Sequence, residues 1–102
     1  MMLYENIVES RGIMKIKGQF VSRTIADENL LIPAGEIAMK IKGLIAVSES
    51  GKLLFDHLVT GCSQDELVAL LMSEYDVDLE TARTDVESFL NQMRQLNMLE
   101  EE

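Results

Sequence analysis

The chain has 102 residues, with one cysteine and no tryptophan, and its formal net charge is −9. This length fits a single domain with a modest hydrophobic core, and it excludes a two-domain enzyme with a cleft between its halves. A lone cysteine excludes an internal disulfide bond, so packing must supply the stability, as is usual in a reducing cytosol.

The first residues carry no secretory signal. Glu5 and Glu9 stand where a signal peptide carries basic residues, and no apolar segment of the required kind follows them. No apolar run in the chain approaches the ~20 residues that span a bilayer. We therefore expect a soluble, cytoplasmic protein without a membrane partner.

The charge is distributed unevenly along the chain. Residues 1–52 carry seven basic and six acidic residues, whereas residues 53–102 carry two basic and twelve acidic ones. An acidic field repels a phosphate backbone, because Lys and Arg supply most of the non-specific affinity for nucleic acid. The composition therefore argues against a nucleic-acid partner.

The front half of the chain is patterned like short strands. Residues 19–25 alternate, residues 27–29 supply turn residues and residues 30–32 form a second apolar run, which together predict a β-hairpin. A third, fully apolar strand is expected at residues 44–47. Between them, residues 37–41 fit either a strand or a helical turn.

The back half is patterned like helices. Ser48 is a good N-cap for a first helix that ends at Gly61. Ser63 and Glu66 have the spacing of a capping box, which opens a second helix. Asp78 caps a third and longest helix with an apolar stripe at helical spacing. The stripe consists of Leu79, Ala82, Val86, Phe89, Leu90, Met93 and Leu96.

This order of elements predicts an α+β fold of the winged helix-turn-helix type. In it, a three-stranded antiparallel sheet is followed by three helices. We assign the domain to residues 18–99. Residues 1–17 are weakly patterned and fit an N-terminal arm, an extra strand or disorder, and residues 100–102 are expected to form a frayed acidic tail.

No group of residues suits catalysis, a metal or a cofactor. His57, the only histidine, is expected on the inner or boundary face of the first helix, without a second metal ligand at a suitable spacing. Cys62 lies in a turn without a strong base nearby. The glycines form no phosphate-binding loop. We therefore expect a binding module, with no resident cofactor, rather than an enzyme.

Two apolar surfaces remain as candidate binding surfaces. The strand at 44–47 is expected at or near a sheet edge, where its backbone groups are unpaired. The third helix is apolar over a wide arc around Phe89. Either all of these residues are core, or the edge strand and the helix face line a groove to which an extended peptide adds as a strand.

A winged-helix DNA-binding regulator is the alternative function, and a small catalytic subunit is a third. The fold would permit DNA binding. However, the exposed positions of the third helix carry Glu80, Asp85 and Glu87, where a recognition helix needs basic or amide side chains.

Several segments also match a known family in their order and spacing. In the strand half these are 20–28, 30–33 and 43–51, and in the helical half they begin with 53–58 and close with 96–99. Residues 18–99 thereby resemble the PqqD family, which takes its name from the D protein of pyrroloquinoline quinone biosynthesis. Ser48 stands where the family usually has Asn, and both residues are competent N-caps.

The resemblance implies a peptide chaperone. Such a domain recognises the leader segment of a ribosomally made precursor peptide and presents it to a modifying enzyme, commonly a radical S-adenosylmethionine protein with iron–sulfur clusters. It also implies that the leader adds to the third strand and packs on the third helix. Some relatives dimerise by exchanging elements, and residues 1–17 fit such an exchanging arm in a homodimer. The implied peptide-binding residues are Leu44, Ile45, Ala46, Val47, Val86, Phe89, Leu90 and Met93. We add Asp85, an acid on the flank of the third helix that favours a leader carrying Lys or Arg.

Overall fold

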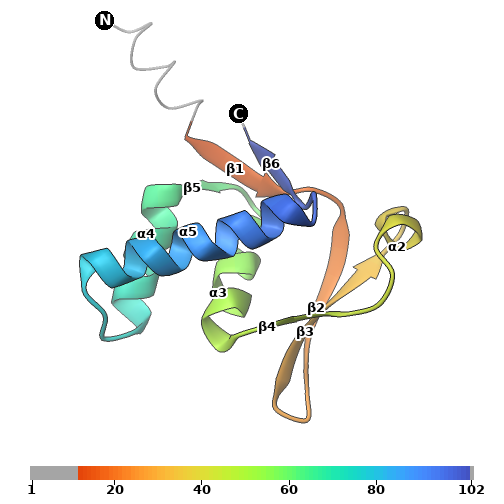
Figure 1. The fold of residues 1–102 in the computed structure, drawn as a ribbon, viewed down its shortest axis with the longest axis horizontal. Coiled ribbons are helices and arrows are strands. Elements are labelled where there is room, and N and C mark those ends of the chain that lie inside the picture. The colour runs from red at the N-terminus through yellow and green to blue at the C-terminus, as the bar shows by residue number, and fades with distance from the viewer. Residues whose placement is uncertain (1–11, 102) are drawn as a thin grey trace, which may run out of the picture.

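The computed structural model describes residues 12–101, and residues 1–11 and 102 lie outside the described part. Figure 1 shows the helices packed together and a hairpin of two strands that extends beyond them. In chain order, the elements are β1 (Ile13–Ile16), β2 (Gln19–Ile25), β3 (Glu28–Ala34), α2 (Ile37–Lys40), β4 (Ile45–Val47), α3 (Glu49–Leu58), β5 (Cys62–Ser63), α4 (Gln64–Glu74), α5 (Leu79–Gln95) and β6 (Leu99–Glu101).

The predicted three-stranded antiparallel sheet is present, with the strand order β2-β3-β4. The hairpin turn lies at Ala26 and Asp27, one residue earlier than the predicted 27–29, so Glu28 and Asn29 belong to β3. Both turn residues have positive φ angles, 52° and 68°. A two-residue hairpin turn of this kind matches the right-handed twist of the strands, although alanine seldom adopts it.

A second antiparallel sheet joins the two ends of the described chain, with the order β5-β1-β6. Its central strand β1 comes from the weakly patterned segment 1–17, whose predicted exchanging arm falls largely outside the described residues. Strand β6 takes in Glu100 and Glu101, which we had assigned to a frayed tail. Arg94 of α5 holds the C-terminal end of β6 in place. It donates from Nε and Nη2 to the Glu101 carboxylate at 3.0 and 3.1 Å.

The three main helices begin where the sequence predicts. Ser48 Oγ accepts from the Gly51 N–H at 3.0 Å, at the start of α3. The capping box of α4 is complete, with Glu66 N–H donating to Ser63 Oγ at 3.2 Å and Ser63 N–H donating to Glu66 Oε1 at 2.8 Å. Asp78 caps α5 through the Thr81 N–H at 2.8 Å. The sequence of residues 37–41 fits either a strand or a helical turn. Residues 37–40 form the short helix α2 in the structure, so the helical turn is correct.

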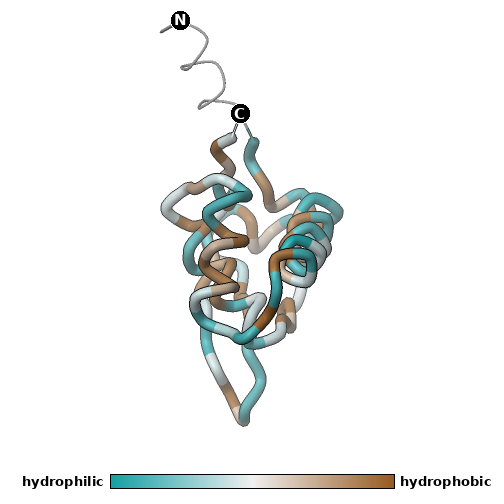
Figure 2. Tube along the Cα trace, turned by 90° about the vertical axis from the view of Figure 1, so that its left-hand side faces the viewer, coloured by the Kyte–Doolittle hydropathy of each residue, from teal (hydrophilic) through white to brown (hydrophobic). Residues whose placement is uncertain are grey.

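One continuous core joins α3, α4, α5 and the inner face of the β2-β3-β4 sheet. Leu31 of β3 is fully buried in it, and Phe20 of β2 meets Phe55 of α3 edge to face, with ring centroids 5.8 Å apart. In Figure 2 the hairpin stands apart at the bottom of the view, with an apolar stretch near its tip. Within residues 12–101, no helix combines the length and the apolar character needed to cross a membrane.

Candidate peptide-binding groove

Strand β4 forms one edge of its sheet. It pairs with β3 through Ile45 opposite Leu31 and Val47 opposite Asn29, and no other strand of residues 12–101 pairs with it. Exposed edges of this kind accept an additional strand. This strand is the part of the sheet that is open to a peptide and also lies beside the helices.

The register fixes which backbone groups of β4 are free. Counting from the two-residue turn, Glu28, Leu30 and Ile32 direct their backbone groups to β2, because hydrogen-bonded and non-bonded pairs alternate along an antiparallel ladder. The intervening residues of β3 therefore bond to Ile45 and Val47. The N–H and C=O of Ala46 must then point to the open side.

A pocket of about 250 Å³ lies between the end of β4 and helix α5. Val47 and Ser48 form its strand side, and Asp85, Phe89 and Gln92 belong to its helix side. Its remaining lining residues are Ser50, Gly51, Leu54 and Ser88. The pocket therefore has a polar rim over an apolar base.

Gly51 allows this close approach of β4, α3 and α5. The residue is buried, and a Cβ atom built on it would lie 3.3 Å from Val47 Cβ and 3.7 Å from Phe89 Cδ1. A larger residue would have to displace the wall of the pocket. The absence of a side chain at this position thus shapes the groove.

A second pocket, of about 310 Å³, continues the first. It shares Ser48, Ser50 and Asp85 with it and extends to Tyr75 and Val77. Leu71 and Glu49 also line it. We call the two pockets together the groove. It runs from the β4 edge to the connection between α4 and α5, and its far end is the more apolar part.

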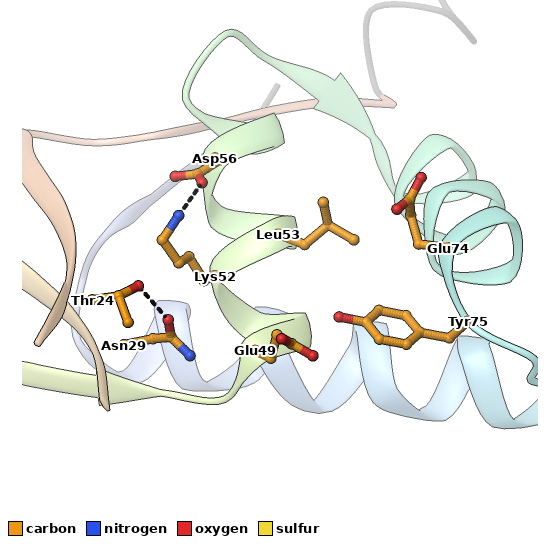
Figure 3. A pocket seen from close by; sticks show the side chains of 8 residues that line it. All are labelled: Thr24, Asn29, Glu49, Lys52, Leu53, Asp56, Glu74 and Tyr75. Atoms are coloured by element: carbon orange, nitrogen blue, oxygen red, sulfur yellow. Dashed lines mark hydrogen bonds and ion pairs between the residues drawn. The ribbon is translucent and has the colours of Figure 1, made fainter. Parts of the chain in front are cut away.

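Tyr75 closes the groove on the side of α4. Figure 3 shows its ring reaching from the end of α4 towards Glu49 at the start of α3. Burial raises the pKa of the Tyr75 phenol above its ordinary value, and the nearby carboxylates of Glu49 and Glu74 raise it further. The phenol therefore stays protonated and can donate a hydrogen bond at neutral pH.

Tyr75 and Glu49 also line a larger, open pocket of about 510 Å³ beside α3. That pocket is lined by polar side chains, and Lys52 spans part of it to reach Asp56 at 3.1 Å. Thr24 and Asn29 close its sheet side with a hydrogen bond of 2.8 Å. Four of its polar side chains are thus paired with one another, whereas the groove lies beside the open edge of β4, so we place the candidate site in the groove.

The structure separates the nine predicted peptide-binding residues into four groups. Ile45, Ala46 and Val47 form β4, and Asp85 and Phe89 line the groove. The other helix residues of the set, Val86, Leu90 and Met93, have no exposed surface. These three side chains are core and form no groove wall in this structure. Leu44 precedes β4 and is 58% exposed.

The sequence analysis missed the polar wall of the groove, formed by Ser88 and Gln92 with Ser48 and Ser50. Gln92 lies three residues after Phe89, on an adjoining row of the helix, so helical spacing alone could have found it. Tyr75 and Val77 follow α4 in an irregular connection. Tyr75 continues the i, i+4 spacing of Leu67 and Leu71, so helical periodicity marks it, whereas no periodic pattern marks Val77.

The residues with reactive side chains have structural roles or none. Burial raises the pKa of the Cys62 thiol to about 11, with a further contribution from Glu66, so little thiolate exists at neutral pH. His57 is exposed, contrary to our expectation, because the buried face of α3 consists of Gly51, Leu54, Phe55 and Leu58. Residues 12–101 contain no cluster of three potential metal ligands.

The fold and the groove define a small α+β binding domain of the winged helix-turn-helix type. The chain belongs to the PqqD family, since the family model described as coenzyme PQQ synthesis protein D matches residues 31–99. This match confirms the resemblance found in the sequence. The family is non-catalytic, in agreement with a binding module. No curated protein matches the chain.

Two solved structures share the fold. TbiB1, in complex with the TbiA(beta) leader peptide, is 27% identical, with a TM-score of 0.67 over 84% of this chain and 94% of that one. A lasso peptide synthetase B1, complexed with the leader peptide, is 16% identical, with a TM-score of 0.65 over 85% and 96% of the two chains. At that identity, the second likeness shows the fold alone.

Proposed function

We propose that this protein binds the leader segment of a ribosomally made precursor peptide at the groove and presents the peptide to a modifying enzyme. The observation that carries the proposal is the open edge of β4 directly beside the groove. Its support includes the likeness to TbiB1, whose structure contains a leader peptide. The family to which the chain belongs is consistent with this role.

In this proposal the leader adds as a strand antiparallel or parallel to β4, and the Ala46 backbone supplies the central pair of hydrogen bonds. Main-chain pairing gives affinity that depends little on sequence, and side-chain pockets give selectivity. Alternate leader side chains enter the groove, where Phe89 and Tyr75 offer apolar surface. Asp85 and Glu49 favour a leader that carries Lys or Arg beside its apolar anchors.

The buried residues of the predicted site then act indirectly. Val86, Leu90 and Met93 hold α5 in place against the core, so that Asp85 and Phe89 face β4. The modifying enzyme is, in our proposal, a radical S-adenosylmethionine protein. That enzyme performs the chemistry, and this chain supplies recognition of the peptide.

A backbone test separates strand addition from other modes of binding. Ala46→Pro removes the N–H that faces the open side while leaving the ladder bonds of Ile45 and Val47 to β3 in place. We expect at least a tenfold loss of affinity for the cognate precursor peptide, which is sought among the short reading frames that neighbour this chain's gene, and calorimetric titration measures the loss. Ala46→Thr keeps the N–H and should bind within about threefold of the unmodified chain.

Two results would reject the proposal. One is equal affinity of the Ala46→Pro and Ala46→Thr variants for the peptide, with both variants folded. The other is tight binding of duplex DNA at low salt with a steep salt dependence, which would favour the DNA-binding alternative.

A further inference from the structure

The outer face of the β2-β3-β4 sheet is unusually apolar. Cross-strand partners share a face, so Val21 lies with Ile32, and Leu30 lies with Ala46. Continuing the register by one residue places Leu44 opposite Ile32. We call the set formed by Val21, Ile25, Leu30, Ile32, Leu44 and Ala46 the outer patch.

Neighbouring residues fix the direction in which this patch faces. Leu31 points into the core, and Phe20 packs on Phe55 of α3. Side chains alternate along a strand, so Leu30 and Val21 point away from the helices. Leu30 is only 8% exposed, yet it is not part of the continuous core.

A sheet that packs one face on a core normally presents polar residues on the other. Here Val21, Ile25 and Leu44 are 40%, 52% and 58% exposed. Arg23 stands between Val21 and Ile25 on this face, so the apolar side chains form two groups, one around Val21 and Ile32 and one at Ile25 near the hairpin tip. Exposed apolar groups of this kind mark interaction sites in soluble proteins. The hairpin that carries much of the patch extends beyond the helices, which leaves the patch accessible to a large partner (Figure 1).

The charge around the patch indicates the partner. Arg23 lies on the same face as its cross-strand partner Leu30, and it takes part in none of the ion pairs among the described residues. Lys40 and Lys42 precede Leu44 on the chain. Glu28, the cross-strand partner of Ile25, lies on the same face, so these charges are three basic residues and one acidic residue. The excess of positive charge favours an acidic surface. A net charge of −9 opposes the approach of a second copy.

We propose that the outer patch docks the modifying enzyme, through an enzyme surface with an apolar centre and an acidic rim. The inference rests on the proposed function. A leader added to β4 would extend the sheet by one strand, and its outward side chains would lie beside Ala46 and enlarge the patch. The enzyme then contacts chaperone and leader together, so it binds the loaded chaperone more tightly than the empty one. By linkage, it also tightens leader binding by the same factor.

The test compares two substitutions of equally exposed residues. Val21→Glu changes the outer patch, and Met72→Glu changes α4, each at a side chain that is 40% exposed. The probes are a precursor peptide and a modifying enzyme sought among the products of the genes that neighbour this chain's own gene, with the enzyme in its reconstituted holo form. Affinity for the enzyme is measured with and without the peptide, and affinity for the peptide is measured separately.

We expect Val21→Glu to weaken enzyme binding at least tenfold and to bind the peptide within twofold of the unmodified chain. Met72→Glu should change neither affinity. If Val21→Glu does not fold, Ile25→Glu near the hairpin tip replaces it. For the unmodified chain, the peptide should tighten enzyme binding at least fivefold.

Unchanged enzyme binding by the folded patch variant would overturn the docking proposal while leaving the proposed function in place. An equal loss with Met72→Glu would also overturn it, as would light scattering that shows a dimer of the unmodified chain and a monomer of Val21→Glu, since the patch would then join two copies. Failure of the unmodified chain to bind the peptide at all would instead reject the proposed function.

Discussion

Helix α5 carries two rows of side chains with different surroundings. The core row, Val86, Leu90 and Met93, is fully buried, whereas the groove row, Asp85, Ser88 and Gln92, lines the pocket beside β4. The rows lie roughly a third of a turn apart, because each residue turns the helix by about 100°. Phe89 stands between them and is 7% exposed. Stability and recognition can therefore be altered separately on one helix.

The largest expected effect is on the core row. Leu90→Ala removes a fully buried side chain and should lower the free energy of unfolding by about 3–5 kcal/mol. Leu79→Ala on the same helix is the control, because that side chain is 47% exposed and should cost under ~1 kcal/mol. Urea denaturation measures both. Similar urea midpoints for the two variants would contradict the assignment of Leu90 to a buried core row.

Gly51 connects the groove to the core, and its substitution should have an intermediate effect. The new Cβ of Gly51→Ala would lie 3.2 Å from Ser48 Oγ and 3.3 Å from Val47 Cβ. Crowding costs about 1–3 kcal/mol, and the helical preference of alanine returns ~1 kcal/mol. We predict a net loss of about 1 kcal/mol by thermal denaturation, together with weaker peptide binding. A more stable variant with full affinity would contradict this role.

Substitutions in the groove row should weaken peptide binding and leave the free energy of unfolding almost unchanged. Gln92→Ala is expected to change the free energy of unfolding by under ~0.5 kcal/mol, because Gln92 is exposed. Loss of its hydrogen bonds to a bound leader should weaken binding by about 1 kcal/mol, or roughly fivefold. Calorimetric titration with the peptide measures this loss. Gln95→Ala, one turn further along α5 and outside the groove, is the control. Equal affinities would remove Gln92 from the site.

The smallest expected effect is a pH dependence of stability that arises at two helix caps outside the groove. Hydrogen bonds from the Ser63 backbone lower the pKa of Glu66, and those from Thr81 lower the pKa of Asp78. A carboxylate with a lowered pKa in the folded state stabilises that state above its unfolded pKa, and this stabilisation is lost as the pH falls through the folded pKa. Stability should thus decline below about pH 4, and Glu66→Gln should reduce the decline. A decline of the same size in that variant would contradict the assignment.

The helical half of the fold could be predicted from local sequence. Ser48, Ser63 and Asp78 are caps whose partners lie three residues away, so a short window contains the whole signal. The β5-β1-β6 sheet could not be predicted in this way. Its register joins Met14 to Glu101, a pairing at long range that no local pattern encodes. The turn was predicted one residue too late for a related reason. Alanine seldom adopts a positive φ, so the sequence does not indicate Ala26 as a turn residue, and pairing of the two strands imposes that conformation.

The site was predicted in part, for a different physical reason. Apolar periodicity identifies the apolar stripe of α5. It does not show which side of that stripe packs against another element and which side stays open to a ligand. Packing of α5 on α4 and α3 buried Val86 and Leu90 and left Asp85 at the groove. Ala46 was in the predicted strand, yet only the register shows that its backbone faces the open side.

Amide hydrogen exchange at β4 tests the central claim most directly. The N–H groups of Ile45 and Val47 face β3 in the free protein, whereas that of Ala46 faces the open side. Addition of the precursor peptide, followed by NMR, should slow exchange at Ala46 at least tenfold and change Ile45 and Val47 much less. Unchanged exchange at Ala46 in the peptide-saturated protein would contradict strand addition at β4.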